Sequence, residues 1–257
     1  IDAAPGGLLV CAWREGTRHE YSSNGKLMFS TSNDDGKTWS AASVIIDAPN
    51  IDDRGAAILT ISESHWLVAY DAYDGSTHTV KTTCTTDGGA TWSTPATVCD
   101  SYSITGTRGA PIKLSNGDVI LPFHRGPADS HQSLAAISSD NGRTWTTYAV
   151  PNADGFKGNE WSVVELADGS LAGVIRTDVN GADGSLWITK SGDKGKTWST
   201  PQKTNLQDTS GWAWKSPGQI FLHEGKPWVL YDDCRFVSVA LATTDDPDLL
   251  DWYVDDR

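Results

Sequence analysis

Short stretches of alternating apolar and polar residues, separated by tight polar turns, run along the whole chain. Residues 109–115 (GAPIKLS) and 119–125 (VILPFHR) have the length and alternation of β-strands, and the Asn-Gly-Asp between them is a hairpin signal. Residues 133–139 and 146–151 add two more strands on either side of a second turn. The pattern predicts a unit of four antiparallel strands, and no segment has a competing helical period.

The same unit recurs at a fixed spacing. The pattern Ser/Thr-x-Asp-x-Gly-x-Thr-Trp occurs four times, and its aspartates, each 53 residues after the one before, are Asp34, Asp87, Asp140 and Asp193. A degraded fifth copy spans residues 243–252, with Asp245 as its aspartate. Five repeats of about 53 residues predict an all-β fold, a β-propeller of four-stranded antiparallel blades that forms a single domain over residues 1–257.

The repeated turn has a structural explanation. In each blade it joins the third strand to the fourth, where Asp and Ser/Thr oxygens can accept backbone N–H bonds and Gly can adopt a positive φ. The Trp that follows is suited to pack between blades. We therefore predict that these turns are scaffolding and that the functional site lies at the other end of the blades.

At that other end, strand 1 begins and strand 2 ends, and both places carry charged residues. Strand-1 starts contribute Arg54, Arg108, Glu160 and Lys215. Strand-2 ends contribute Arg14, Glu15, Asp71, Tyr73, Arg125, Arg176, Asp232, Asp233 and Arg235. We expect them to converge at one mouth of the propeller channel as a ligand site. The alternative is a solvated rim whose charges pair with one another.

Composition narrows the class of ligand. The formal net charge is −13, so there is no basic stripe for nucleic acid, and an anionic ligand needs a local cluster of arginines. The chain has no apolar run of 18 or more residues, so the sequence does not predict a membrane span. Zinc and phosphate-loop motifs are missing, and we read residues 178–184 (DVNGADG) as a polar loop. We predict no metal and no cofactor.

The first residue and the cysteines bear on localisation. The chain starts at Ile1 rather than Met, as expected for a processed product, and we expect a secreted, extracellular or periplasmic protein. Cys84 and Cys99 could pair across a hairpin, and Cys11 and Cys234 could join the first and last repeats. Four unpaired thiols are the open alternative.

The repeated turn is the Asp-box, or BNR repeat, and the chain resembles the sialidase (neuraminidase) superfamily. Residues 159–176 (NEWSVVELADGSLAGVIR) are similar to the sialidase segment in which a Glu opens one strand and an Arg closes the next. The resemblance implies that Glu160 activates a catalytic tyrosine, and that Arg176 and Arg235 belong to an arginine clamp for the substrate carboxylate. Bidentate arginine suits a carboxylate, and sialidases pair a Tyr nucleophile with a carboxylate.

The chain also departs from the family pattern. Related sialidases have six blades, where we count five. Their first clamp arginine would lie upstream of Ile1, and their catalytic tyrosine would follow the last Asp-box. The acid/base carboxylate has no clear match: Glu20 lies nearest, with Glu15 and His19 as alternatives. Tyr73 or Tyr21 is our candidate nucleophile. By position alone, Arg54 and Arg108 could form an anion clamp on other blades.

The sequence thus predicts a sialidase-like exo-glycoside hydrolase that acts on a terminal acidic sugar. Its predicted catalytic residues are Glu160, Glu20 and Tyr73. Its predicted substrate-binding residues are Arg176, Arg235, Arg54, Arg108, Arg14, Arg125, Asp71 and Trp161. The alternative is a carbohydrate-binding propeller without catalysis, in which Trp13, Trp161, Trp212 and Trp214 stack on sugar rings. A glycan or small sugar is the expected partner in either case.

Overall fold

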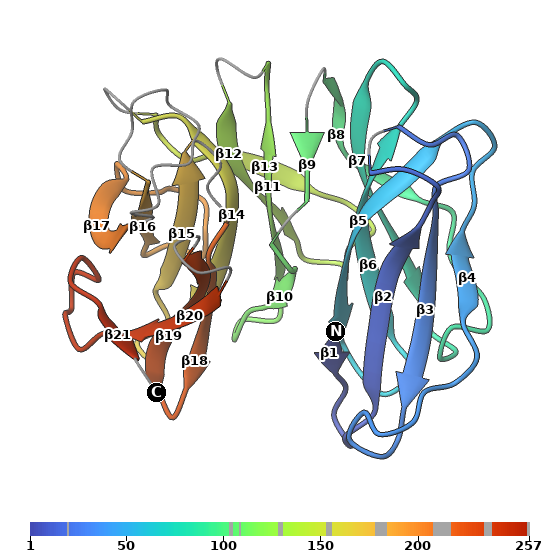
Figure 1. Ribbon diagram of the computed structural model, residues 1–257, viewed down its shortest axis with the longest axis horizontal. Helices are drawn as coiled ribbons and strands as arrows, with labels where there is room; N and C mark the ends of the chain where they lie inside the picture. Colours follow the sequence, from blue (N-terminus) through green and yellow to red (C-terminus); the bar gives the residue numbers. More distant parts are fainter. Residues whose placement is uncertain are drawn as a thin grey trace. The chain divides into compact units, whose positions relative to one another are not determined.

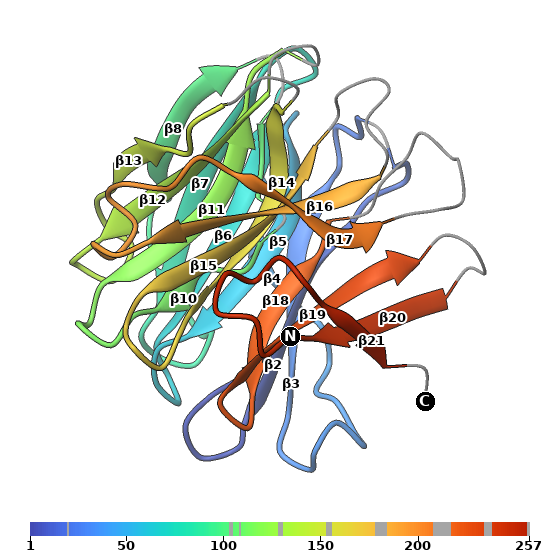
Figure 2. The same ribbon diagram turned by 90° about the vertical axis from the view of Figure 1, so that its left-hand side faces the viewer.

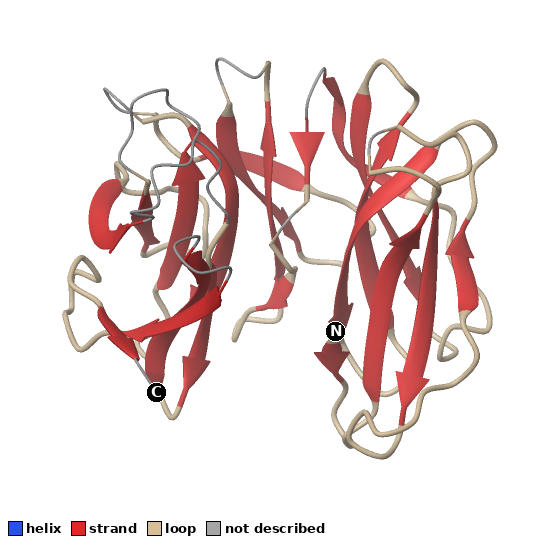
Figure 3. Ribbon diagram, viewed as in Figure 1, coloured by secondary structure: helices blue, strands red, loops and turns tan. Residues whose placement is uncertain are grey.

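The computed structural model describes residues 1–19, 21–102, 105–107, 109–127, 131–152, 156–177, 184–207, 217–233 and 238–255. Strands, turns and loops make up all of these residues (Figure 3). Within them there is accordingly no helix of the length and apolar character needed to cross a membrane.

The strands form antiparallel sheets in chain order, which we call blades 1 to 5. Blade 1 contains β1 (Asp2–Ala3), β2 (Leu9–Glu15), β3 (Lys26–Ser32) and β4 (Ser43–Ile46). Blade 2 contains β5 (Asp52–Thr60), β6 (Trp66–Tyr73), β7 (His78–Thr85) and β8 (Ala96–Tyr102). Blade 3 contains β10 (Ile112–Lys113), β11 (Val119–Arg125), β12 (Gln132–Ser138) and β13 (Thr146–Ala149), and β9 (Thr105–Gly106) also pairs with β11.

Blade 4 contains β14 (Gly158–Glu165), β15 (Leu171–Thr177), β16 (Ser185–Ser191) and β17 (Gln202–Gln207). Blade 5 contains β18 (Gln219–His223), β19 (Lys226–Asp233), β20 (Ser238–Thr243) and β21 (Tyr253–Asp255), whose order can be followed in Figure 2. The predicted all-β class, with five four-stranded antiparallel blades of a β-propeller, is confirmed. Blade 3 differs from the prediction by the additional short strand β9.

The chain divides into two compact units. Unit 1 comprises Ile1–Leu121 and Ala136–Thr147, and unit 2 comprises Pro122–Ala135 and Tyr148–Arg257. Blades 1 and 2 belong wholly to unit 1, and their labelled strands can be traced in Figure 1, whereas blades 4 and 5 belong to unit 2. The residues of blade 3 are divided between the units.

The four complete Asp-boxes share one hydrogen-bond pattern. In the first, Asp34 Oδ1 accepts the backbone N–H of Thr38 at 2.8 Å, and Oδ2 accepts the Thr38 hydroxyl at 2.6 Å. The Ser32 hydroxyl donates to Asp34 Oδ1 at 2.8 Å and accepts the backbone N–H of Gly36, whose φ is 80°. The side-chain oxygens of Ser32 and Asp34 are thus engaged within the turn, as expected for scaffolding.

The fifth box is shifted by one residue from the prediction. Asp246, rather than Asp245, accepts the backbone N–H groups of Leu250 and Asp251, at 2.9 and 3.1 Å. The Asp245 side chain instead forms an ion pair with Lys226. Asp246 lies 53 residues after Asp193, so the fifth repeat keeps the period of the others. The fifth box is one residue longer, because Trp252 lies six residues after Asp246 whereas Trp198 lies five after Asp193.

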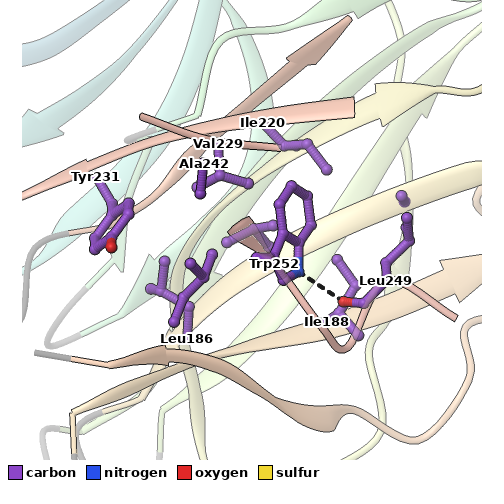
Figure 4. Packing of buried hydrophobic residues seen from close by; sticks show 11 residues of the cluster. Leu186, Ile188, Ile220, Val229, Tyr231, Ala242, Leu249 and Trp252 are labelled. Atoms are coloured by element: carbon purple, nitrogen blue, oxygen red, sulfur yellow. Dashed lines mark hydrogen bonds between the residues drawn. The ribbon is translucent and has the colours of Figure 1, made fainter. Parts of the chain in front are cut away.

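Each unit has its own apolar core between neighbouring blades. In unit 2, one core joins Ala172, Val174, Leu186 and Ile188 of blade 4 to Ile220, Val229, Tyr231 and Ala242 of blade 5 (Figure 4). Trp252 of the fifth box closes this core and donates its indole N–H to the Leu249 carbonyl at 2.8 Å. In unit 1, Phe29 of blade 1 packs edge-on against Trp66 of blade 2 and Trp92 of the second box. The boxes therefore anchor the blades, except that Trp39 of the first box is exposed.

The proposed hairpin disulfide is not formed. Cys99 on β8 lies in register with Val80, and no disulfide joins it to Cys84 on β7. Cys234, the proposed partner of Cys11, lies outside the described residues.

Candidate functional site

Unit 1 gathers four of the predicted site residues at the end of blades 1 and 2 away from the Asp-boxes. Arg14 lies near the end of β2, and Arg54 lies near the start of β5. Asp71 and Tyr73 lie at the end of β6. The antiparallel up-and-down order brings these strand ends together.

A buried aspartate holds the two arginines. Asp52, fully buried on β5, accepts two hydrogen bonds from Arg14, at 2.7 Å to Nε and 3.0 Å to Nη2. Arg54 Nη1 lies 3.7 Å from the same carboxylate, and its Nη2 donates to the His19 carbonyl at 3.0 Å. The backbone N–H of Ser22 also donates a hydrogen bond to the Asp52 carboxylate, at 3.1 Å. We call Arg14, Asp52 and Arg54 the arginine cluster; its formal charge is +1.

Strand register extends this cluster across blade 2. Arg54 faces Asp71, and Asp52 faces Tyr73, across the β5–β6 pair; Tyr73 in turn faces His78 on β7. Residues directly opposite in antiparallel strands point to the same face of a sheet. Asp71 is hydrogen-bonded to His78 Nδ1 at 2.8 Å, and the His78 ring stacks on Tyr73 with a centroid distance of 3.9 Å. Tyr21, the alternative candidate nucleophile, packs edge-on against Tyr73 at 5.3 Å.

Unit 2 contains the second group, and a β-bulge creates it. On β14 and β15, Gly158 pairs with Thr177 and Trp161 pairs with Ile175, so Asn159 and Glu160 together oppose one residue, Arg176. Bulges re-aim a side chain in this way. Arg176 Nη1 lies 2.8 Å from Glu160 Oε2, and each side chain is 14% exposed. Since both are partly accessible, the pair can meet a ligand as well as each other.

The bulge is fixed by its neighbours within unit 2. The Ser133 hydroxyl donates to the Asn159 carbonyl at 2.8 Å, and the Asn159 side chain accepts the backbone N–H of Glu160 at 2.8 Å. Gly158 packs so closely on Ser133 that a Cβ there would lie 2.3 Å from the hydroxyl oxygen. Glycine is therefore required at the residue before the bulge.

The remaining predicted residues have different placements. Trp161 is 1% exposed and donates its indole N–H to the Phe123 and Leu134 carbonyls, at 2.9 and 3.2 Å. This placement packs the ring inside unit 2 and leaves no face for stacking on a sugar. Arg125 is partly exposed at the end of β11. Three further candidates lie outside the described residues: Glu20, Arg108 and Arg235.

Two other carboxylates in unit 1 are relevant to acid–base chemistry. Burial raises the pKa of the Asp53 carboxyl to about 6, a value suited to a general acid, but Asp53 is only 1% exposed and is hydrogen-bonded to the Ala48 backbone N–H. Glu15, the alternative to Glu20, is more accessible. It lies 3.0 Å from Lys26 and lines a polar hollow with Thr17, Asn24 and Asp47.

Sequence reasoning missed Asp52 and His78. Asp52 carried a weak signal, because it stands next to Asp53 and Arg54 at a strand start. His78 had no such signal, since its role depends on the β6–β7 register. Among the described residues, no three His, Cys, Asp or Glu side chains are grouped so as to hold a metal ion.

Known structures with this fold include sialidases. The structure of a protein of unknown function from Dyadobacter fermentans DSM 18053 is 20% identical, with a TM-score of 0.81, and the match covers 98% of this chain and 80% of that one. The NanB sialidase from Streptococcus pneumoniae is 13% identical, with a TM-score of 0.75 and coverage of 100% and 59%. The Trypanosoma rangeli sialidase, solved with sialic acid, is 18% identical, with a TM-score of 0.67 and coverage of 94% and 45%.

These likenesses show a shared β-propeller fold. This chain spans 59% and 45% of the lengths of the two sialidase chains. No curated protein matches its sequence. A family model described as a BNR repeat-like domain matches residues 7–245, nearly the whole chain. With its Asp-box turns and sialidase-type blades, the chain belongs to the BNR repeat-like domain family.

Proposed function

We propose that the chain acts as a sialidase-like exo-glycoside hydrolase on a terminal acidic sugar. The observation that carries this proposal is the Glu160–Arg176 pair, which the β14 bulge aims toward the end of the blade away from the Asp-boxes. It occupies the segment that resembles the sialidase motif. The fold shared with the two sialidases supports the same reaction class.

Glu160 and Arg176 suit two tasks in such a reaction: activation of the nucleophile and binding of the substrate carboxylate. A carboxylate can accept the proton of a tyrosine hydroxyl, which raises the nucleophilicity of the tyrosine toward the anomeric carbon. Arg176 donates a hydrogen bond from Nη1 to Glu160 Oε2 and so orients this carboxylate, and its guanidinium is suited to a substrate carboxylate. Tyr73, the predicted nucleophile, lies in unit 1, and its role stays a prediction.

In unit 1, the arginine cluster is suited to the anionic group of the substrate. Arg14 and Arg54 both lie at the buried Asp52, and their side chains are partly exposed, at 18% and 13%. In a protein with a net charge of −13, two guanidinium groups at one place suit an anion better than the rest of the surface does.

Hydrolysis of a panel of aryl glycosides, sialosides and glucuronides included, tests the proposal. We expect wild-type turnover on an acidic glycoside and a fall in kcat of about 100-fold or more in Glu160→Gln. Glu165→Gln is the matched control, because Glu165 lies on the same strand and is paired with Lys194. Turnover that is equal in both variants would exclude a catalytic role for Glu160.

Binding without hydrolysis is the second candidate, and one observation favours it. Asp52, Asp71 and Glu160 are all paired with basic side chains, and the carboxyl with a raised pKa, Asp53, is too buried to protonate a leaving group. If no glycoside is turned over, yet acidic sugars bind, this second function replaces the first.

A further inference from the structure

Blade 5 of unit 2 carries apolar side chains on both faces of its sheet. One face packs against blade 4 through Ile220, Val229 and Ala242, which are in register on β18, β19 and β20 (Figure 4). Residues that alternate with these along each strand belong to the opposite face, since successive side chains of a strand point to opposite sides of the sheet. We call this second side the outer face of blade 5.

The outer face is apolar over four strands. Cross-strand register places six apolar residues on it, namely Phe221, Trp228, Leu230, Val239, Leu241 and Tyr253. Val239 and Tyr253 are each 69% exposed, whereas Phe221, Leu230 and Leu241 are 37–38% exposed. These side chains therefore form one patch that runs across the sheet from β18 to β21.

The strands of blade 5 have the sequence of a sheet that is covered on both sides. Residues 228–231 (WVLY) on β19 and 239–242 (VALA) on β20 are unbroken apolar runs. Strands buried on both faces have such runs, whereas a sheet with one solvated face alternates apolar and polar residues. In unit 1, β6 begins with a similar run (WLVAY, 66–70), and its residues 66–72 are all buried. In blade 5, the outer half of the same kind of run is exposed.

The exposed area of this patch is large enough for association with a partner. With a fully accessible area of about 200 Å² for a large side chain, the five exposed residues leave roughly 500 Å² open to solvent. This is close to the upper limit for an apolar patch on a monomeric protein. A stable complex buries about 800 Å² on each partner. The patch and its polar rim therefore match one partner's share of an ordinary interface.

A second copy of the same face suits this patch. Two sheets stack face to face at about 10 Å when their side chains interdigitate, and the inner face of blade 5 already packs on a sheet, that of blade 4. Leu230 and Leu241 face each other at the centre of the patch, so a two-fold axis there brings each of them against the same pair in the other copy. All six residues of the patch are uncharged, so they bring no like charges together.

We propose that the outer face of blade 5 is a homodimer interface, in which two copies of the chain stack blade 5 on blade 5 about a two-fold axis. The interface lies wholly within unit 2 and uses neither the Glu160–Arg176 pair nor the arginine cluster, so it does not depend on the proposed reaction. We expect a dissociation constant of about 1–10 µM. Below this concentration the chain is a monomer whose outer face is open to water.

Sedimentation velocity from about 0.5 to 100 µM protein at physiological salt tests the proposal. We expect the wild type to change from monomer to dimer across this range. Val239→Asp places a charge in both halves of the interface and should raise the dissociation constant by about 100-fold or more. The matched control is Val44→Asp on β4, because Val44 is an exposed valine of unit 1, at 47%. This control should dimerise as the wild type does.

A wild-type chain that stays monomeric at about 100 µM would overturn the proposal, and so would equal weakening by Val239→Asp and Val44→Asp. Tyr253→Ser is a second arm, because it removes an exposed ring without adding a charge. It should raise the dissociation constant by about tenfold, and an unchanged value would also contradict the interface. Circular dichroism verifies that each variant is folded, as expected for positions that are 69% exposed.

Discussion

Asp53 shows how one buried carboxyl couples folding to pH. Its Oδ2 accepts the Ala48 N–H at 2.9 Å, and its Oδ1 has no hydrogen-bond partner. Burial raises its pKa from 3.8 to about 6, with contributions from Asp47 and Asp52 that act in the same direction. The folded state therefore binds this proton more tightly than the unfolded chain, and ionisation of Asp53 is destabilising.

We predict that Asp53→Asn removes this penalty. The favourable contribution of the protonated carboxyl is complete below about pH 4 and is lost as pH rises through about 6. A shift of about 2 pKa units corresponds to about 3 kcal/mol. The unfolding free energy of the variant, from urea titrations, should therefore rise relative to the wild type by up to about 3 kcal/mol between pH 4 and pH 8. Asp47→Asn, an exposed neighbour, should show little change; a constant difference for Asp53→Asn would contradict the assignment.

The candidate site was only partly predictable from its residues. Arg14, Arg54, Asp71 and Tyr73 were found because charged and aromatic residues at strand ends share one end of a blade. The partners that hold them were not found: Asp52 and His78 gain their roles from cross-strand register, which the sequence does not display. The wrong role for Trp161 has a similar cause, since the bulge beside Glu160 decides that the ring turns inward.

At the scale of the element, the same position in two successive blades can differ in burial. Ile188 on β16 and Leu241 on β20 are separated by 53 residues and occupy the same position in successive repeats. Ile188 faces Val174 and is 2% exposed in the core between blades 4 and 5. Leu241 faces Leu230, and these two side chains are 37% and 38% exposed. Equivalent sequence positions thus differ in burial.

We predict a corresponding difference in stability. Ile188→Ala should lower the unfolding free energy by about 2–5 kcal/mol, because it removes buried methyl groups and leaves a cavity. Leu241→Ala should cost less than about 1 kcal/mol, because its site is already open to water. Urea unfolding of the two variants checks this. Equal losses would mean that the outer face of blade 5 is covered in solution.

The elements themselves were the most predictable part of the molecule. Residues 119–125 were predicted to form a strand, and β11 has these bounds; residues 133–139 were predicted as the next strand, and β12 is Gln132–Ser138. The Asp-box turns recur every 53 residues and need particular oxygens and glycines, so they are easily recognised. Each strand can then be located by its distance from the nearest box. The prediction was wrong where the repeated turn is degraded, because Asp246 and not Asp245 is the aspartate of the fifth box.

At the scale of the whole molecule, opposing titrations determine where the fold is most stable. Hydrogen bonds from the Thr38 hydroxyl and backbone lower the pKa of Asp34 to about 2, and bonds from Thr85 and Thr91 lower that of Asp87 to about 2. Their stabilising contributions are complete above about pH 4 and are lost as pH falls through about 2. Burial lowers the pKa of His65 below its ordinary value of 6.5. Protonation of His65 therefore destabilises the folded state as pH falls below 6.5.

Asp53 and the net charge both lower the unfolding free energy as pH rises. Asp53 destabilises the fold as pH rises through about 6, and a net charge of −13 at pH 7 adds self-repulsion that weakens as carboxylates are protonated. We therefore predict that the unfolding free energy is highest between about pH 4 and 6, measured by urea titration across pH 2–9. A maximum at or above pH 7 would mean that His65 outweighs Asp53.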